Sequence, residues 1–375
     1  MEQRQGAMEG VGRLMDTLLD FYRGRRVFLT GHTGFKGSWM SRVLVNAGAV
    51  LTGYALEPPT SPGLFDLAGL EDRMKSVIGD VRDYTVLRAA FEAARPEIVI
   101  HMAAQPIVRE SYRDPRGTYE TNVMGTVNLL ECVRNTDCVR SLLNVTTDKV
   151  YLNREWPWGY REDEALDGFD PYSNSKSCAE LATHSYKNSF FSGPGAPAIS
   201  TARAGNVIGG GDFARDRIIP DCVRAATEGR DIVVRNPCST RPYQHVLEPV
   251  TAYLMIARRQ WEDPSLAGWY NVGPDESDCV TTGELVDLFV ARWGDGVRRA
   301  DLADSRGPHE AGFLKLDCSK IRAVFGWRPT WHIDEAVAMT CAWTKVWQAG
   351  GDVPGEMDRE IAAFLMHRTC KGEGH

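Results

Sequence analysis

A tyrosine and a lysine four residues apart, Tyr172 and Lys176, form the pair in this chain that is best suited to proton transfer. At this spacing, both side chains lie on one face of a helix. An ammonium group close to a phenol stabilises the phenolate and lowers the pKa of the tyrosine from ~10 toward neutral pH. Such a tyrosine can remove the proton from a hydroxyl group that is being oxidised. In isolation, the spacing is more typical of an exposed pair on a helix surface, and that interpretation stays open.

Three glycines at a spacing of three residues, Gly31, Gly34 and Gly37, follow the apolar run Val27–Thr30. This pattern is typical of a strand that enters a helix through a tight turn, with the pyrophosphate of a dinucleotide on the helix N-terminus. Gly31 permits the turn, Gly34 lets the backbone approach the phosphates, and Gly37 allows the helix to pack closely on the strand. Because glycine-rich turns are common at strand–helix junctions, the motif alone is a weak indication.

The run Thr147-Asp148-Lys149 places a hydroxyl, a carboxyl and an amine directly after the apolar run Ser141–Val145. If that run is a strand of a parallel sheet, the three side chains lie at its carboxyl end, where such sheets bind ligands. A turn stabilised by the Thr and Asp side chains is the alternative. The glycine turn and the Tyr–Lys pair in the same chain favour a shared site.

Short apolar runs bounded by turn or polar residues predict the buried strands that position these groups. The runs are Val27–Thr30, Val50–Ala55, Ile98–His101, Ser141–Val145 and Ile199–Arg203. The amphipathic segments between them predict helices over Tyr84–Ala94, Thr118–Arg134 and Ser175–Ser189. Strands that alternate with crossover helices indicate a parallel sheet covered on both faces. The predicted fold class is therefore α/β, a doubly wound Rossmann domain with a smaller C-terminal lobe.

The pattern changes after Asn206, where the chain becomes less regular. We predict the Rossmann domain over residues 25–205 and the smaller lobe mainly over residues 206–375, with short returns to the first domain. Elements of the lobe are predicted at Ile232–Val234, Thr281–Trp293 and Ile333–Trp347. Residues 1–24 form an N-terminal extension, in which Leu14, Met15, Leu18, Leu19 and Tyr22 predict a short amphipathic helix. We expect it to pack on the body, with contact to a partner as the alternative.

Composition excludes several classes of function. The 375 residues carry a formal net charge of −7 and no basic run, which argues against nucleic-acid binding. No apolar stretch approaches the ~20 residues that span a bilayer, so we expect no membrane partner. The nine cysteines are scattered without metal-ligand spacing, which indicates reduced thiols of a cytoplasmic protein and no metal site.

Nine motifs together resemble the extended short-chain dehydrogenase/reductase family and, within it, the branch of CDP-glucose 4,6-dehydratases. They are Gly31–Trp39, Gly53–Thr60, Gly79–Asp83, His101–Pro106, Thr147–Lys149, Trp158–Glu162, Asp170–Lys176, Arg203–Asp212 and Arg241–Glu248. Many relatives share the individual pieces. Lys149, the run Gln244–Glu248 and the segment Asn153–Trp156 point to the CDP-glucose branch.

The resemblance implies an NAD-dependent dehydration of CDP-glucose to its 4-keto-6-deoxy product. Tyr172, aided by Lys176, takes the proton of the sugar 4-hydroxyl as hydride leaves carbon 4. Thr147 hydrogen-bonds the oxygen at carbon 4, and protonated Asp148 assists departure of the 6-hydroxyl. Because an epimerase needs no acid and base for carbons 5 and 6, Asp148 and Lys149 argue against that rival. Intact Tyr172 and Lys176 argue against a non-catalytic sensor.

The base that removes the proton from carbon 5 is less certain from the sequence. Related nucleotide-sugar dehydratases have a glutamate at the position of Lys149. A lysine acts as a base only if its pKa falls well below ~10.4, through burial or neighbouring cations. We favour Lys149 as this base, with the alternative that it is an electrostatic clamp and another group takes the proton.

For the cofactor site, the resemblance implies contacts from residues at the ends of the first strands and on the helices that follow. These residues are Gly31, Thr33, Gly34, Phe35, Lys36, Gly37, Asp80, Val81, Ala103, Ala104, Gln105, Asn122, Tyr172 and Lys176. Asp80 is the predicted partner of the adenine amino group, with a helix N-cap as the alternative. Tyr54 stands where NAD-binding proteins usually have an acid, with Glu57 slightly beyond. Because no arginine there could bind a 2′-phosphate, NAD is favoured over NADP.

For the substrate, Arg217 and Arg241 are candidates to bind the diphosphate, since guanidinium groups match phosphate oxygens. Asn206 could donate to the same phosphates, and His309 and Glu310 resemble the nucleotide-site loop of the family. A surface salt bridge is the alternative for each of these residues. His101 could line the cofactor site or be a hydrogen-bonded core histidine.

The resemblance also implies a homodimer, formed through a four-helix contact of the helices predicted at 118–134 and 175–189. Packing inside one subunit would explain their apolar faces too.

Overall fold

The computed structural model describes residues 18–301 and 312–371. Its centre is a seven-stranded sheet in the order β11-β6-β5-β4-β1-β2-β3, in which all neighbouring strands run parallel. The strands are β1 (Arg26–Thr30), β2 (Val50–Ala55), β3 (Lys75–Ile78), β4 (Ile98–His101), β5 (Ser141–Val145), β6 (Ala198–Ala204) and β11 (Trp269–Val272). The order reverses between β1 and β4, so the loops after these two strands border the crevice in which such sheets bind ligands.

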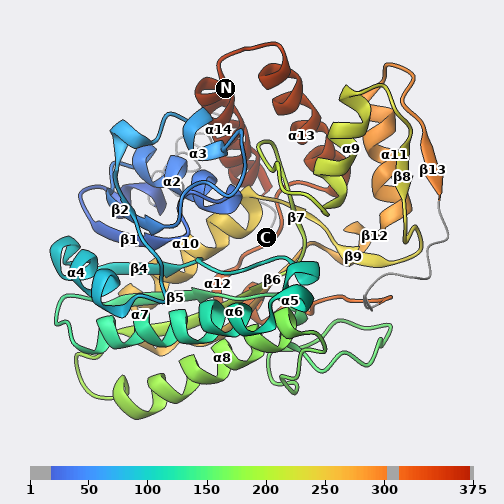
Figure 1. The fold of residues 1–375 in the computed structure, drawn as a ribbon. Helices are drawn as coiled ribbons and strands as arrows, with labels where there is room; N and C mark the ends of the chain where they lie inside the picture. The colour runs from blue at the N-terminus through green and yellow to red at the C-terminus, as the bar shows by residue number, and fades with distance from the viewer. Residues whose placement is uncertain (1–17, 302–311, 372–375) are drawn as a thin grey trace, which may run out of the picture.

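Helices cover both faces of the sheet (Figure 1). One layer contains α4 (Tyr84–Ala94), α7 (Gly125–Arg134) and α8 (Pro171–Phe190), and the other contains α2 (Phe35–Asn46) and α10 (Leu247–Glu262). Two separate apolar cores fill the spaces between sheet and helices. The predicted α/β doubly wound architecture is confirmed.

The five predicted strands are present with bounds that differ by at most one residue at each end, and the helix over Tyr84–Ala94 is confirmed. The helix predicted over 118–134 consists of α6 (Pro115–Tyr119), a π-helical segment (Glu120–Met124) and α7. The helix predicted from Ser175 begins earlier, because Pro171 occupies its first turn and the Asp170 side chain accepts from the Ser173 N–H.

A smaller lobe lies beside the carboxyl ends of the strands, at the right of Figure 1. It contains α9 (Ile218–Thr227), β8 (Ile232–Val234), β9 (Thr240–Pro242), β12 (Cys279–Thr281), α11 (Thr282–Trp293) and β13 (Arg299–Asp301). A third apolar core, which includes Ile219, Leu285 and Phe289, holds it together. Thr281 caps α11 through a capping box with Glu284, so that helix starts one residue later than predicted.

The other α-helices and short strands are α3 (Leu64–Leu67), α5 (Val108–Arg113), β7 (Val207–Ile208), β10 (Gln244–His245), α12 (Ser319–Phe325), α13 (Ile333–Gln348) and α14 (Val353–Lys371). Within the described ranges, none of the helices is long and apolar enough to cross a lipid bilayer. The boundaries after residues 24 and 205 stay predictions.

The segment before β1 packs on the body, as predicted for its described part. Residues 18–22 are helical, and Leu18 and Tyr22 are buried. The Tyr22 hydroxyl donates to the Leu254 carbonyl of α10 at 2.6 Å, so this short helix is fastened to the helical layer. Leu14 and Met15 lie outside the described residues.

Candidate functional site

The turn between β1 and α2 has the backbone geometry that a dinucleotide pyrophosphate requires. Gly31 adopts a φ of +80°, which favours glycine. A Cβ on Gly37 would lie 2.0 Å from the Gly31 carbonyl oxygen, so helix and turn touch backbone to backbone. Gly34 caps α2 without a side-chain hydrogen bond, and the first turn contains no acidic residue. The Gly31 and Gly34 N–H groups donate to the Tyr54 and Gly31 carbonyls, and the first turn of α2 directs its remaining N–H groups outward, so the residues fit a dinucleotide.

We expect Gly37→Ala to weaken dinucleotide binding by about 5- to 150-fold, because the overpacked turn must open, at a cost of about 1–3 kcal/mol. The measurement is calorimetric titration with NAD+, together with the melting temperature of each protein. Gly193→Ala is the matched control, since a Cβ there meets no atom within 4 Å and its φ is not positive. Equal affinities of the two variants for NAD+ would contradict this account of the turn.

The loop after β4 is held in place by Asn122, from the π-helical segment. Its side chain accepts from the Gln105 N–H at 2.8 Å and donates to the Gln105 carbonyl at 3.1 Å and to the Ser175 hydroxyl at 2.9 Å. The loop therefore stays beside α8, and the Ala103 N–H donates to the Thr30 hydroxyl at 3.1 Å. Asn122 and Gln105 thus position backbone at the predicted cofactor crevice.

His101 is a core histidine and not a wall of the cofactor site. Its two ring nitrogens are hydrogen-bonded to Thr30 at 2.7 Å and to Thr126 at 3.0 Å, and it is buried. Burial, helped by the nearby Lys176 charge, lowers the pKa of His101 to about 3, so the ring is neutral. The core interpretation is the one that the structure supports.

The outer edge of the crevice differs in part from the sequence prediction. Asp83, and not Asp80, caps α4, so the N-cap alternative for Asp80 is wrong. The Asp80 carboxylate pairs with Arg82 at 2.6 Å, and this contact lowers the pKa of Asp80. The Tyr54 side chain is fully buried and donates to the Asp80 carbonyl, whereas Glu57 is exposed. The neighbouring Val81 is buried against α7.

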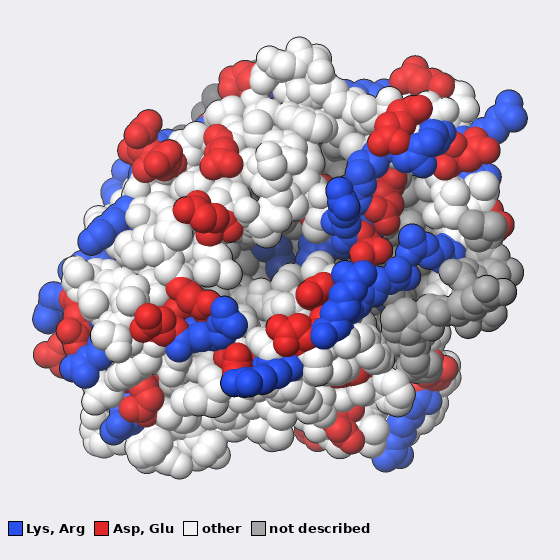
Figure 2. Space-filling model, in the orientation of Figure 1, with Lys and Arg blue, Asp and Glu red and all other residues white. Residues whose placement is uncertain are grey.

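A cavity of about 930 Å³ lies between the carboxyl ends of the strands and the smaller lobe. Figure 2 shows it as a hollow with lysine and arginine side chains in its depth and along its rim. The cavity brings together many of the predicted site residues. Those that line it are Phe35, Lys36, Thr147, Lys149, Tyr172, Asn206, Arg217 and Arg241. His309 and Glu310 lie outside the described residues.

Asp148 lies directly behind the cavity wall and is fully buried. Its Oδ1 atom accepts from the Thr147 hydroxyl at 2.9 Å and from the Lys149 ammonium at 3.2 Å, whereas its Oδ2 atom has no partner among the described residues. Lys149 also donates to the Asn206 side chain at 3.3 Å. The carboxyl group therefore has one saturated oxygen and one that is available to a hydroxyl or to a proton.

The Tyr172–Lys176 pair lies on α8, as the spacing predicts, but the expected direction of the tyrosine pKa is wrong. Burial, together with the Asp148 charge, raises the pKa of Tyr172 to about 12, although a hydrogen bond with Thr147 opposes this. Burial lowers the pKa of Lys176 to about 8, and its ammonium donates to the Val145 carbonyl at 2.9 Å. The cost of burying a phenolate outweighs the stabilisation that we expected from Lys176.

A buried ion pair beneath the site was not predicted from the sequence. Glu180 of α8 pairs with Arg203 of β6 at 3.0 Å and accepts from Thr146 at 2.5 Å and Thr201 at 2.6 Å. These contacts lower the pKa of Glu180 to about 2. They fasten the helix that contains Tyr172 to β6 and to Thr146, the residue directly before the Thr-Asp-Lys run. The signal in the sequence was Glu180 itself, a carboxylate two helical turns after Tyr172 and one turn after Lys176, on the same face of the helix.

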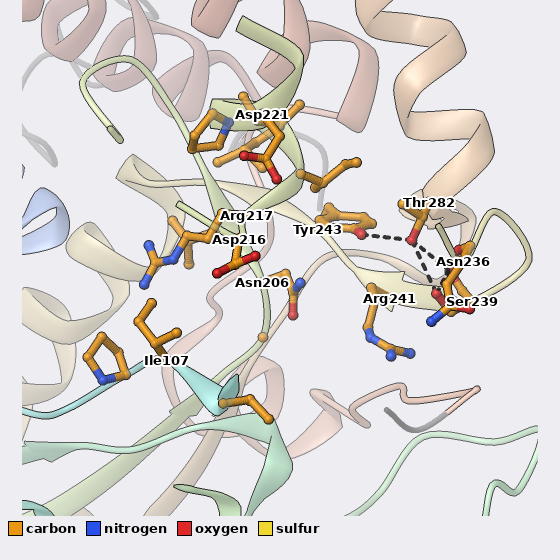
Figure 3. Close-up of a pocket in the computed structure, with 18 of the residues that line it drawn as sticks. Ile107, Asn206, Asp216, Arg217, Asp221, Asn236, Ser239, Arg241, Tyr243 and Thr282 are labelled. Atoms are coloured by element: carbon orange, nitrogen blue, oxygen red, sulfur yellow. Dashed lines mark hydrogen bonds between the residues drawn. The ribbon is translucent and has the colours of Figure 1, made fainter. Parts of the chain in front are cut away.

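The three candidate phosphate ligands face one cavity from separate segments: Asn206 from the loop after β6, Arg217 from the start of α9 and Arg241 from β9, with Asn206 between the two arginines in Figure 3. The Arg217 guanidinium pairs with Asp212 at 3.0 Å, a partner that sequence reasoning missed. The Arg241 guanidinium donates to the Thr240 carbonyl at 2.9 Å. Both arginines thus have fixed positions on the smaller-lobe side of the cavity.

Comparisons with known proteins agree with this geometry. The sequence model of the GDP-mannose 4,6 dehydratase family matches residues 28–340. The chain is 47% identical over 359 residues to CDP-glucose 4,6-dehydratase of Salmonella typhimurium, covering 93% of this chain and 99% of that protein. It is 24% identical over 342 residues to dTDP-glucose 4,6-dehydratase of Shigella flexneri, covering 85% and 92% of the two chains.

Solved structures show the same fold. The dTDP-glucose 4,6-dehydratase of Bacillus anthracis in complex with NAD has a TM-score of 0.72 and 20% identity, covering 88% of this chain and 99% of that one. The UDP-glucose 4-epimerase of Thermotoga maritima has a TM-score of 0.73 and 20% identity, covering 86% and 99%. The fold alone therefore does not separate dehydratases from epimerases, whereas the sequence match does. The chain belongs to the GDP-mannose 4,6 dehydratase family of nucleotide-sugar dehydratases.

Proposed function

We propose that the protein catalyses the NAD-dependent 4,6-dehydration of CDP-glucose to CDP-4-keto-6-deoxyglucose. The observation that carries the proposal is a chain of contacts beside the cavity: Thr147 hydrogen-bonds Tyr172 and donates to Asp148 at 2.9 Å, and Lys149 contacts the same carboxyl at 3.2 Å. Epimerisation at carbon 4 needs the tyrosine but not the carboxyl–amine pair. The 47% identity to a CDP-glucose 4,6-dehydratase supports this choice of substrate.

NAD supplies the hydride acceptor for carbon 4 and the hydride donor for carbon 6. Tyr172 accepts the proton of the 4-hydroxyl, and Thr147 donates its single hydroxyl proton to the oxygen at carbon 4 in place of Asp148 Oδ1. Lys176 lies one turn further along α8, and its ammonium group donates to the Val145 carbonyl. This contact holds the face of the helix that contains Tyr172 against β5. Together these groups take up the proton of the 4-hydroxyl and hold the oxygen of the resulting ketone.

The ketone acidifies the hydrogen on carbon 5, and the 6-hydroxyl then leaves as water. Asp148 is the proton donor for this departure, because its Oδ2 atom is buried and has no partner within the described chain. The dehydration thus uses Asp148 on the leaving group, with Lys149 either as the base at carbon 5 or as a clamp on Asp148. Arg217, Arg241 and Asn206 bind the diphosphate, and His309 and Glu310 complete the nucleotide site.

We also propose a cytoplasmic homodimer. Apolar side chains exposed on the layer of α7 and α8 support the dimer, among them Met124, Leu181 and Phe190, each about half exposed. Contact of these helices with the same helices of a second copy would cover them. The unpaired thiols of the eight described cysteines support a reducing compartment.

Purified protein and NAD+ are incubated separately with CDP-glucose, UDP-glucose, dTDP-glucose and GDP-mannose, and the products are analysed by mass spectrometry. We expect CDP-glucose to lose one water without net formation of NADH. Loss of water from another sugar nucleotide would support the proposed reaction but replace CDP-glucose as the proposed substrate. Four unchanged masses would refute the dehydratase, and an isomer of unchanged mass would identify an epimerase.

A further inference from the structure

The proposed dehydration leaves one proton to be moved inside the site in every turnover. Tyr172 gains the proton of the sugar 4-hydroxyl, whereas Asp148 loses a proton to the departing 6-hydroxyl. The proton taken from carbon 5 returns there after hydride reaches carbon 6, so the base at carbon 5 ends the cycle unchanged. Because the sugar and its products together carry the same number of protons, Tyr172 finishes with one proton too many and Asp148 with one too few.

The Thr147 hydroxyl lies in contact with both of these groups. It donates to Asp148 Oδ1 at 2.9 Å, and it hydrogen-bonds Tyr172. A threonine hydroxyl has a single proton and two acceptor lone pairs. Because that proton is given to Asp148, the hydrogen bond between Thr147 and Tyr172 is donated by the tyrosine. The three groups therefore form a chain of hydrogen bonds that runs from the phenol through Thr147 to the carboxyl group.

Contacts on both sides of the Thr-Asp-Lys run hold this chain in place. The Lys176 ammonium of α8 donates to the Val145 carbonyl at 2.9 Å. One residue later on the same helix, the Ser177 hydroxyl donates to the Val150 carbonyl at 2.7 Å. These two carbonyls lie on either side of the run in the sequence. The helix that contains the tyrosine is therefore fastened to the backbone before and after the threonine, which fixes the two hydroxyl groups relative to each other.

The other contact of the Asp148 carboxyl group does not remove the surplus proton. Lys149 lies 3.2 Å from Asp148 Oδ1 and has a side chain that is 27% exposed, so it could bring a proton from solvent to the carboxylate. That route leaves Tyr172 protonated, since Lys149 makes no hydrogen bond with the phenol within residues 18–301 and 312–371. Asp148 is itself fully buried, so solvent does not reach it directly. Only a group that touches both ends can reset both.

We propose that Thr147 passes the surplus proton from Tyr172 to Asp148 between one turnover and the next. This inference rests on the proposed dehydration and gives Thr147 a second task beside its hydrogen bond to oxygen 4. While the sugar is bound, the threonine hydroxyl donates to oxygen 4. Once the product has left, it turns back to Asp148 and restores the chain. One internal transfer thus resets the acid and the base of the site without a proton from solvent.

The transfer moves two protons along two hydrogen bonds. The O–H bond of Tyr172 breaks as its proton binds Oγ1 of Thr147, and the original hydroxyl proton of Thr147 moves to Asp148 Oδ1. Threonine stays neutral, and the result is a phenolate that can accept the next proton and a carboxylic acid that can donate one. Burial and the Asp148 charge raise the pKa of Tyr172 to about 12, and the second of these causes disappears as Asp148 takes up the proton.

Turnover of CDP-glucose at saturating NAD+ is measured for Thr147→Val and Thr147→Ser as imidazole is added at constant pH and ionic strength. Valine resembles threonine in shape but has no hydroxyl, whereas serine keeps the hydroxyl. We expect Thr147→Val to be about 100-fold slower than the wild type, the lower range for loss of a proton-transfer group. Imidazole accepts and supplies protons near neutral pH, so it should speed up this variant about tenfold.

The wild type, Thr147→Ser and the control Thr85→Ala should not respond to imidazole. Thr85 is exposed and does not line the cavity. The response to imidazole separates the relay from the hydrogen bond at oxygen 4, because a buffer carries protons but does not replace a hydrogen bond to the bound sugar. If Thr147→Val melts well below the wild type, Thr147→Ala provides the same comparison.

Three results would overturn the relay. They are wild-type turnover by Thr147→Val, slow turnover by Thr147→Val that is the same at all imidazole concentrations, and an equal need for imidazole in Thr147→Ser. Failure of the wild type to dehydrate any of the four sugar nucleotides would instead refute the proposed function itself.

Discussion

Replacement of Tyr172 by phenylalanine is expected to lower the turnover of the dehydration by about 10³-fold, within the range for loss of a general base. The change removes one oxygen from the cavity wall and leaves α8 and Lys176 in place. Without the phenol, the 4-hydroxyl has no proton acceptor beside Thr147, so oxidation at carbon 4 stops before any later step. The measurement is single-turnover formation of reduced nicotinamide together with the mass of the product.

Tyr112→Phe is the matched control, because Tyr112 is exposed and does not line the cavity. It should keep wild-type turnover, and both variants should melt at nearly the same temperature. Because the pKa of Tyr172 is raised to about 12, the phenol is protonated at neutral pH and the phenolate fraction rises with pH. Oxidation by the wild type should therefore speed up as the pH rises. If Tyr172→Phe kept the turnover of the wild type, a residue other than Tyr172 would have to be the base.

Replacement of Glu180 by leucine is expected to destabilise the protein by about 3–5 kcal/mol, since it leaves the Arg203 charge buried without its partner. The side chains of Glu180 and Arg203 are 0% and 1% exposed, so water cannot compensate for the loss. Thr146 and Thr201 would also lose the acceptor of their hydroxyl groups. The measurement is the free energy of unfolding in urea.

The double variant Glu180→Leu/Arg203→Leu separates two causes of destabilisation: a buried arginine left without a counter-charge, and the loss of the ion pair itself. It removes both charges, and we expect it to be more stable than Glu180→Leu alone. The pKa of Glu180 falls from 4.5 to about 2 in the folded protein, so its contribution to stability is complete above about pH 4.5. That contribution is lost as the pH falls toward about 2. A double variant that is less stable than the single one would contradict the account.

Much of the sheet could be predicted because its central strands are continuous apolar runs. Ile98–His101 and Ser141–Val145 are buried along their whole length, and such runs stand out in a sequence. The edge strands β3 and β11 were not among the five predicted strands. Strand β3, Lys75–Ile78, is only partly buried, and Trp269–Val272 belongs to the sheet only because the chain returns to β6. Such pairing depends on tertiary structure.

The residues of the site could be predicted from the sequence, but their protonation states and their contacts with one another could not. Strand ends place Thr147 and Lys149 at the cavity, and helix spacing places Tyr172 beside them. The direction of the Tyr172 pKa depends on how deeply the phenol is buried, and the contact between Lys149 and Asp148 depends on side-chain rotamers. Neither quantity follows from spacing.

The late position of β11 has a consequence for synthesis of the chain on the ribosome. A nascent chain that ends near residue 205 already contains six strands of the sheet, but the edge of β6 has no neighbour until Val272 has been made. Helix α10 is also missing at that stage, so Tyr22 and Ser141 lack their carbonyl acceptors at Leu254 and Ala257. An open strand edge is a template for pairing with other chains. The dinucleotide-binding half is therefore translated first but completed only after much of the smaller lobe has been synthesised. The incomplete chain at this stage is the form of the protein that is most prone to aggregation.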